Sequence, residues 1–338
     1  MRKAYSILTV LAALFFITAC NNKLNILSPY KNVTVVYGLM DQSDTAHYIR
    51  VNKAFEGLGN AYTMAQQFDS SYYPANQLNV QLVCFNGYGT KVSTTTLTAD
   101  SSILLPPGTF SYPKQILYKT KAKLSVLDIY GNNNTYQLVV TNLKTGQVLY
   151  GSTQLLPDVT FTQGLGGTSS SALPMSSSSS NPSLIKWNSS INGRIYQMAF
   201  RFFYHEQTGS FNGERYFDWI FSPQTSSTIA GGQSMEYSYS EQEFFQEVRT
   251  TVPIIAGAVR RADSIQVLFT TGSDDFNTYI QLSQPSLGLN QDIPSYSDVK
   301  NGIGIYTARH TQIATRQISA NVFDTLVNGT EFSAYGFQ

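Results

Sequence analysis

The stretch RIYQMAFRFFY, residues Arg194 to Tyr204, decides the fold class because its side chains alternate with the period of a β-strand. One face collects large apolar and aromatic side chains, namely Tyr196, Met198, Phe200, Phe202 and Tyr204. The other face carries Gln197 and Arg201. A second aromatic segment, Tyr216 to Phe221, follows the glycine-containing turn Gly209–Gly213, and we expect the two segments to pair. The pattern predicts a sheet that packs on an aromatic core.

The composition agrees with a β-rich chain. Charged residues make up only 13% of the 338 residues, against roughly 25% in an average soluble protein. Tyr and Phe, at 22 and 20 residues, favour strands over helices. The formal net charge of +1 argues against nucleic acid as a partner, because binding to phosphates calls for a basic patch. A hydrophobic content of 42% argues against disorder.

The N-terminal half contains several strand-like segments separated by turn signals. They are residues 33–39, 46–55, 79–85 and 116–120, followed by the hairpin Tyr136 to Tyr150 with its turn at Lys144-Thr145-Gly146. Short strands at this spacing, with Pro and Gly between them, are typical of a sandwich. We therefore expect an immunoglobulin-like β-sandwich over residues 31–163.

Residues 164–183 are a compositional break, rich in Ser and Gly. Such a stretch has little apolar surface to bury, so we interpret it as a linker between two domains. A long loop within one domain is the alternative. On the first interpretation, residues 184–338 form a second β-rich sandwich domain.

One short helix is expected in this second domain, near residues 240–252. Ser240-Glu241-Gln242-Glu243 matches a capping box, in which the Ser240 hydroxyl accepts from the Glu243 N–H. Phe244, Phe245 and Val248 then follow at helical spacing, and Pro253 ends the segment.

The N-terminus carries an export signal. Arg2 and Lys3 precede an apolar run, Ile7 to Ile17, which ends in Ile17-Thr18-Ala19-Cys20. This resembles a lipobox, so we expect residues 1–19 to be a lipoprotein signal peptide and Cys20 to carry the lipid. Two or three acyl chains hold a protein firmly to a membrane. Residues 20–30 then form a tether, and an ordinary signal peptide with a chance cysteine is the alternative.

Motifs for catalysis and metal binding are scarce. The three histidines, His47, His205 and His310, lie in separate segments without HExxH spacing, and the chain has no GxSxG elbow. We therefore assign no catalytic residue and no metal ligand, and we expect no cofactor. Asp274 and Asp275 offer oxygen ligands of the kind calcium prefers, but without EF-hand spacing. A solvated turn between strands is the simpler interpretation.

Aromatic residues suggest a binding role instead. We expect Tyr237 and Tyr239 to lie on a loop where they can contact a ligand or protein partner. Tyr72-Tyr73 could act similarly. The two tryptophans, Trp187 and Trp219, are better explained by core packing, and Cys84 by a buried, inert thiol. Gly302 and Gly304 do not satisfy GxGxxG, so we attribute them to backbone conformation or close packing.

Several motifs together resemble an uncharacterised family of Bacteroidota-type exported cell-envelope lipoproteins with two β-rich domains. Besides the lipobox they are VVYGL at 35–39, YIRVNKAF at 48–55, Lys186-Trp187, NGRIY at 192–196 and NGIGIY at 301–306. The resemblance implies an outer-membrane, lipid-anchored location, with the periplasmic or outward-facing side left open. It also implies work alongside a TonB-dependent transporter or another envelope lipoprotein. It supplies no catalytic residue.

We therefore expect a non-enzymatic, lipid-anchored protein of the cell envelope that binds a ligand or protein partner through loops on a sandwich scaffold. The alternative is a hydrolase acting on glycan or peptide, with dispersed carboxylates that leave no motif. An enzyme would show acids or histidines converging in a concave pocket.

Overall fold

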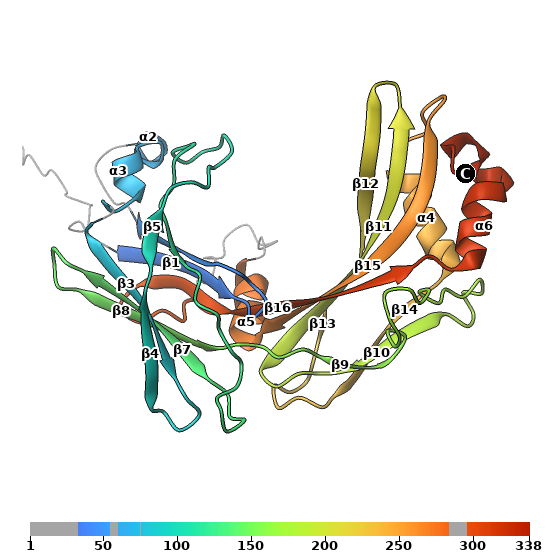
Figure 1. Cartoon of the computed structure of the whole chain (residues 1–338). Helices are drawn as coiled ribbons and strands as arrows, with labels where there is room; N and C mark the ends of the chain where they lie inside the picture. Colours follow the sequence, from blue (N-terminus) through green and yellow to red (C-terminus); the bar gives the residue numbers. More distant parts are fainter. Residues whose placement is uncertain (1–32, 55–59, 75, 284–295) are drawn as a thin grey trace, which may run out of the picture.

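The computed structural model describes residues 33–54, 60–74, 76–283 and 296–338 (Figure 1). Strands account for 46% of the structure and helices for 15%, so the fold is mainly β, as the sequence predicts. The expected signal peptide, the expected tether and the expected lipidation site at Cys20 lie outside the described residues.

Two sandwiches follow one another along the chain. The strands of the first are β1 (Val33–Met40), β2 (His47–Ala54), β3 (Leu78–Phe85), β4 (Lys91–Thr96), β5 (Thr98–Asp100), β6 (Leu117–Thr120), β7 (Thr135–Asn142) and β8 (Val148–Gln154). The strands of the second are β9 (Thr160–Gln163), β10 (Ser183–Asn188), β11 (Gly193–Thr208), β12 (Phe211–Ile220), β13 (Gln224–Thr225), β14 (Ser234–Tyr239) and β15 (Val259–Ser273). The last strand, β16 (Ile303–Gln317), belongs to both.

A single nine-stranded sheet joins the two sandwiches, in the order β12-β11-β15-β16-β1-β2-β6-β5 with β13 beside β11. The first part of β16 pairs in parallel with β1, from Val35 opposite Ile303 to Met40 opposite Ala308. From Arg309 onward the same strand pairs antiparallel with β15. Figure 1 shows β16 running from one sandwich to the other. The two sandwiches are therefore connected through the backbone hydrogen bonds of one strand.

The first core lies between this sheet and the four-stranded sheet β4-β3-β7-β8. Val36, Ile49 and Tyr118 face inward from one side, and Leu82 and Leu138 from the other. The hairpin expected at residues 136–150 is present as β7 and β8. The buried Cys84 lies in the same core.

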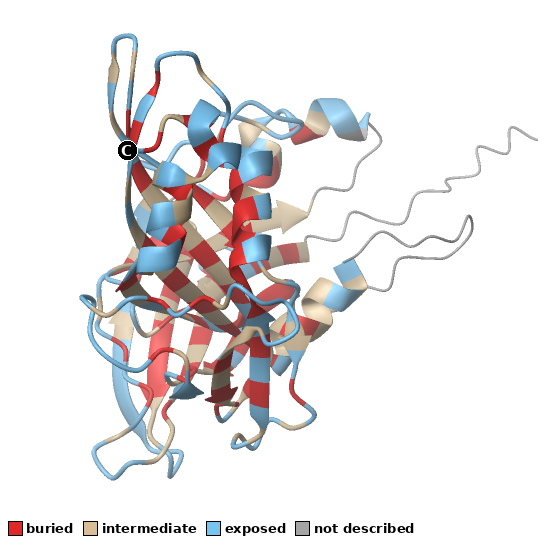
Figure 2. Cartoon of the chain, turned by 90° about the vertical axis from the view of Figure 1, so that its right-hand side faces the viewer, coloured by how far each residue is buried: buried red, intermediate tan, exposed pale blue. Residues whose placement is uncertain are grey.

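The second core lies between the β12-β11-β15 part of the large sheet and the three-stranded sheet β14-β10-β9. The alternation expected along Arg194–Tyr204 is confirmed, because its five apolar side chains are buried. Figure 2 shows strands and helices on which buried and exposed residues alternate. Trp187 is completely buried, and its ring lies 4.8 Å from that of Phe269.

The expected helix is present as α4 (Glu241–Thr251), and Ser240 caps it by accepting from the Glu243 N–H. The expectation of a single helix was wrong. Other short helical segments among the described residues are α2 (Ala61–Ala65), α3 (Phe68–Ser71), α5 (Asp274–Ser283), α6 (Ala320–Asn328) and the 3-10 helix η1 (Thr330–Tyr335). Helices α4 and α6 cover the second core with Phe244, Val322 and Leu326.

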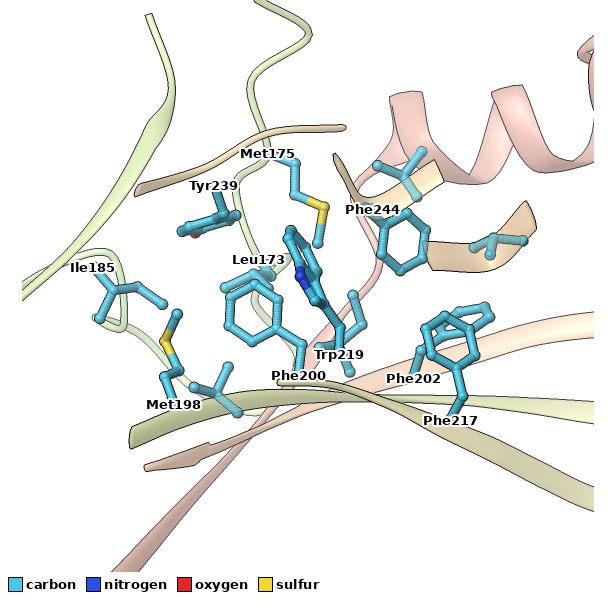
Figure 3. Packing of buried hydrophobic residues seen from close by; sticks show 14 of the residues in the cluster. Leu173, Met175, Ile185, Met198, Phe200, Phe202, Phe217, Trp219, Tyr239 and Phe244 are labelled. Carbon is cyan, nitrogen blue, oxygen red and sulfur yellow. The ribbon is translucent and has the colours of Figure 1, made fainter. Parts of the chain in front are cut away.

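The segment 164–183 differs from the linker that its composition suggests. Leu165, Leu173 and Met175 are buried in the second core, and Figure 3 shows the last two among its aromatic rings. The Leu173 N–H also donates to the carbonyl of Gln317 on β16. A few apolar residues among many serines are enough to fix the segment against the core. The expected boundary between residues 163 and 184 also divides two sheets. It separates β9 from its neighbour β10, and β16 from its neighbour β1.

Candidate functional site

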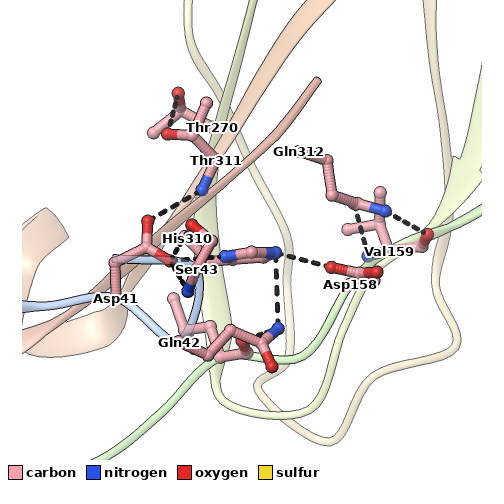
Figure 4. Close-up of polar contacts among 10 residues, drawn as sticks. Asp41, Gln42, Ser43, Asp158, Val159, Thr270, His310, Thr311 and Gln312 are labelled. Carbon is pink, nitrogen blue, oxygen red and sulfur yellow. Dashed lines mark hydrogen bonds and ion pairs between the residues drawn. The ribbon is translucent and has the colours of Figure 1, made fainter. Parts of the chain in front are cut away.

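His310 lies near the middle of β16, where the two sandwiches meet, and it is held between two carboxylates (Figure 4). Its Nδ1 lies 2.7 Å from Oδ1 of Asp41, and its Nε2 lies 2.6 Å from Oδ1 of Asp158. The side chains of His310 and Asp41 are only 5% and 4% exposed, whereas that of Asp158 is 67% exposed. The cluster therefore has a buried end at Asp41 and an open end at Asp158.

Local turn chemistry fixes the buried carboxylate. Asp41 directly follows β1, and its Oδ1 accepts from both the N–H and the hydroxyl of Ser43, at 2.9 and 2.7 Å. Its Oδ2 accepts from the Thr311 N–H at 3.1 Å. Asp41 is therefore a turn residue that accepts from the residue two positions ahead. The same side chain also reaches β16, because β1 and β16 are adjacent strands.

The pKa shifts of His310 and Asp41 both favour the charged form of each side chain. Burial by itself would lower the pKa of His310, but the hydrogen bonds to Asp41 and Asp158 outweigh it and raise the pKa above the ordinary 6.5. Burial would raise the pKa of Asp41, but hydrogen bonds from His310 and Ser43 bring it below 3.8. Opposite charges stabilise each other in both cases. The arrangement favours a protonated His310 between two carboxylates.

A groove of about 890 Å³ opens beside this cluster. Gln42 and Asp158 line the groove and also contact His310, whose Nε2 lies 3.3 Å from Nε2 of Gln42. Ile191 lines it from the second sandwich, Gln154 from the end of β8 and Pro157 from the segment after β8. The remaining lining residues come from loops of the first sandwich: Gly87, Ser125, Val126, Leu127, Gly131, Asn132 and Asn133. The groove thus runs along the junction of the two sandwiches, with Asp158 between it and His310.

The chemistry of this cluster is that of an ion triad. In a nucleophile-activating triad the second histidine nitrogen faces a hydroxyl or thiol. Here both nitrogens of His310 face carboxylates, Asp41 and Asp158. Among the described residues, no group of three or more His, Cys, Asp or Glu side chains is arranged to hold a metal ion. The cluster can therefore tie the junction together and present Asp158 to the groove.

The expectation that Tyr237 and Tyr239 lie on an exposed binding loop was wrong. Both residues lie on strand β14, are 5% and 0% exposed, and pack in the second core. The Tyr237 hydroxyl donates to the carbonyls of Tyr196 and Ser222, each at 2.9 Å. The alternation of Ser234–Tyr239 places Met235, Tyr237 and Tyr239 on one face, which is the signal for a strand.

The acidic pair also lies in a different element from the one expected. Asp274 and Asp275 begin helix α5 and do not form a turn between strands, because the chain enters the helix directly from β15. Asp274 pairs with Arg194 at 3.2 Å, and Asp275 accepts from the Tyr296 hydroxyl. The calcium suggestion gains no support from these contacts.

The other aromatic candidates are core residues. Tyr72 and Tyr73 are 4% and 2% exposed, so they do not offer a surface for stacking. Trp187 and Trp219 lie in the second core, as the simpler interpretation held. The aromatic rings that do lie outside the core near the groove are Tyr88 and Tyr130, at 71% and 68% exposed.

Sequence reasoning missed His310 as a site residue because its partners are remote. Asp41 is 269 positions away and Asp158 is 152 positions away. The available signal was weak: a histidine in a long polar stretch near the C-terminus, an Asp directly after the first strand, and an Asp four residues after β8. The pairing of β1 with β16 brings Asp41 to His310. Asp158 is brought there because Gln312 on β16 accepts from the Val159 N–H and donates to the Val159 carbonyl.

Comparisons with known proteins add little. No family model matches the chain, and no curated protein is significantly similar. Among solved structures, the C-terminal globular domain of an oligosaccharyltransferase from Pyrococcus abyssi is 7% identical, with a TM-score of 0.24. The match covers 70% of this chain but only 46% of that one. A similarity this weak supports no inference about fold or function. The protein is therefore classified by its own fold, a mainly β chain whose two sandwiches share one sheet.

Proposed function

We propose that the protein is a lipid-anchored, non-enzymatic binding protein of the cell envelope, and that the groove at the junction holds a neutral, polyhydroxylated ligand such as a glycan. The observation that carries this proposal is the groove lining. Ligand sites are commonly clefts of about 300–1,000 Å³ that combine apolar walls with a few polar groups. The junction groove, at about 890 Å³, falls within this range.

The lining suits hydroxyl groups. Four amide side chains, Gln42, Asn132, Asn133 and Gln154, can each donate and accept hydrogen bonds, as sugar hydroxyls do. Apolar walls come from Val126, Leu127, Pro157 and Ile191. The carboxylate in the groove, Asp158, already faces His310. His310 shares its one positive charge with Asp41, so the cluster keeps a net negative charge at Asp158, which disfavours an anionic ligand, while the four amides suit a neutral one.

Aromatic rings flank the groove. Tyr88 and Tyr130 directly follow and precede the lining residues Gly87 and Gly131, and their ring centroids are 6.0 Å apart. Exposed tyrosines of this kind provide an apolar face and a polar tip, which suits stacking against a sugar ring. They replace Tyr237 and Tyr239 as the aromatic residues of the proposed site.

Location in the envelope rests on the N-terminal sequence. The lipobox at Cys20 and the resemblance to exported lipoproteins support a lipid anchor in the outer membrane. Among the described residues, no helix is both long and apolar enough to cross a bilayer. Work alongside a TonB-dependent transporter is part of the same proposal. Cys20→Ala should release the protein from membranes, and a transporter should co-purify with the tagged wild type only while it is anchored.

The groove is tested with the purified mature protein and a panel of neutral oligosaccharides, for example maltohexaose, xylohexaose and chitohexaose, by calorimetry. We expect at least one to bind, and Asn132→Ala and Tyr130→Ala each to weaken it about tenfold. Tyr62→Ala is the matched control, because Tyr62 is also exposed, at 60%, but lies on α2. Absence of binding to the whole panel, or hydrolysis of a bound oligosaccharide, would contradict the proposal.

A further inference from the structure

A separate pocket of about 580 Å³ lies on the first sandwich and shares no lining residue with the junction groove. Its floor is formed by β1 and β2, and its cover by α3 and the loop at 105–110. Figure 1 shows α3 and the loop after β5 on the same side of the first sandwich. The loop is held in place by the Ser111 N–H, which donates to Ala65 on α2, and by the Leu105 N–H, which donates to Pro113. The pocket is therefore built from fixed elements.

The walls of this pocket are mostly apolar. Val35 and Tyr37 face it from β1, and Leu105, Pro106 and Phe110 from the loop. Tyr37 and Phe110 remain 42% and 61% exposed. Such surfaces gain free energy when an apolar ligand removes them from water.

Two cations line the same space. Arg50 lies opposite Tyr37 on β2 and donates through Nη2 to Gln115 Oε1 at 2.8 Å, a neutral partner. Lys53 donates to the carbonyl of Asp69, and burial lowers its pKa from 10.5. Among the described residues, neither cation forms an ion pair with a carboxylate within 4.0 Å. Two half-buried cations beside apolar walls favour a ligand that carries a negative charge on an apolar body.

Two further polar atoms in the pocket lack partners. Ser71 is 5% exposed, and its hydroxyl has no hydrogen-bond partner among the described residues. The side-chain oxygen of Asn52 is buried and unpartnered in the same part of the structure. Both residues line the pocket. A buried polar group without a partner costs free energy, and a bound ligand that supplies the partner recovers it.

We propose that this pocket binds an apolar carboxylate, with Arg50 and Lys53 facing the charge, the Ser71 hydroxyl donating to it, and the apolar body lying against Leu105, Pro106 and Phe110. A planar carboxylate matches the fork of an arginine guanidinium better than a spherical anion does. Two sources share this chemistry, a free fatty acid and the C-terminal carboxylate of an apolar peptide. The oxygen of Asn52 could accept from a peptide N–H, which a fatty acid lacks.

The experiment compares carboxylates with their neutral counterparts on the intact mature protein. Decanoate is measured against decanol, and the peptide acetyl-Ala-Val-Leu against its C-terminal amide, by calorimetry at pH 7. We expect each carboxylate that binds to do so at least tenfold more tightly than its neutral partner. The tighter of the two carboxylates identifies the source. Binding of neither carboxylate, or equal binding of acid and neutral partner, would overturn the proposal.

Three variants separate ligand recognition from folding. Arg50→Gln and Phe110→Ala should each weaken the carboxylate about tenfold, and Phe110 is exposed enough that its replacement leaves the fold intact. Ser71→Ala should weaken binding while leaving the melting temperature unchanged or higher, because it removes an unpartnered buried hydroxyl. Lys91→Gln, on the exposed strand β4, is the control and should bind as wild type. Unchanged affinity in Arg50→Gln would overturn the assignment of the charge site.

Discussion

His310 Nδ1 and Asp41 Oδ1 lie 2.7 Å apart although 269 positions separate the two residues in the chain. Asp41 directly follows the first strand of the first sandwich, and His310 lies on the last strand, which both sandwiches share. The pair therefore connects the segment after the first strand to the last strand of the described chain. Both side chains are at least 95% buried, so their charges compensate each other in a place that water scarcely reaches.

The first prediction concerns the pH dependence of this pair. His310→Gln should lower the free energy of unfolding by about 2 kcal/mol near neutral pH, because it leaves the buried Asp41 carboxylate without its charged partner. The pKa of His310 is raised, so its contribution is complete below pH 6.5 and is lost as the pH rises through the folded-state value. The pKa of Asp41 is lowered, so its contribution is present above pH 3.8 and is lost on further acidification. Urea unfolding should show the largest difference between pH 3.8 and 6.5.

His205→Gln is the matched control for this measurement. His205 is exposed at the end of β11 and contacts only Asn212, at 2.6 Å, among the hydrogen bonds of the described residues. Its replacement should change the unfolding free energy by less than about 0.5 kcal/mol. A wild-type minus His310→Gln difference that stays constant from pH 5 to 9 would show that His310 is not charged in the folded protein.

The second prediction concerns the serine-rich segment. Leu173 is completely buried in the second core, so Leu173→Ala should lower the unfolding free energy by about 2–5 kcal/mol. Ser179→Ala, at an exposed position of the same segment, should be neutral within about 0.5 kcal/mol. Thermal or urea unfolding measures both. Equal stabilities of the two variants would restore the interpretation of residues 164–183 as a free linker.

Much of the fold could be predicted from local patterns. The alternation of β11, the hairpin of β7 and β8 and the capping box of α4 are each encoded within about 15 residues of sequence, and all three are present. Helix α6 was missed because Val, Phe, Thr and Asn are poor helix formers. Its helical state is set by packing of Val322 and Leu326 on the second core.

The site could not be predicted because it depends on tertiary pairing. Residues 303–317 do not alternate cleanly, since the first part of the strand contributes to one core and the last part to another. Nothing near His310 in the sequence indicates that Asp41 and Asp158 lie beside it. The failure at Tyr237 and Tyr239 is different, because their alternation with polar residues was visible and predicted the strand in which they lie.

The third prediction concerns the contact between β1 and β16. Gly304 has φ +114°, and a Cβ atom there would overlap the carbonyl oxygen of Val36 on the paired strand. Gly304→Ala should therefore lower the unfolding free energy by about 2 kcal/mol or more, through backbone strain and steric overlap. Gly166→Ala is the control, because a Cβ at that position meets nothing within 4 Å. Melting temperatures that fall equally in both variants would contradict this explanation.

The last prediction concerns the buried ion pair of the second sandwich. Arg260 and Glu206 are 0% and 4% exposed at their side chains, and Arg260 Nη2 lies 2.8 Å from Glu206 Oε2. Arg260 also donates to the carbonyls of Tyr335 and Pro253, which fixes the C-terminal segment. Glu206→Ala leaves the guanidinium buried without its carboxylate, so we expect a loss of about 3–5 kcal/mol in unfolding free energy.

The control is Glu236→Ala, which removes an ion pair of similar length, 2.9 Å to Lys186, at side chains that are 34% and 54% exposed. Water screens that pair, so its loss should cost less than about 1 kcal/mol. The two variants are compared by urea unfolding at low and at 1 M salt. Salt should reduce the small effect of Glu236→Ala and leave the large effect of Glu206→Ala almost unchanged, because screening acts mainly on exposed charges. Similar small losses in both variants would mean that the packing around Arg260, and not its charge pairing with Glu206, holds the C-terminal segment in place.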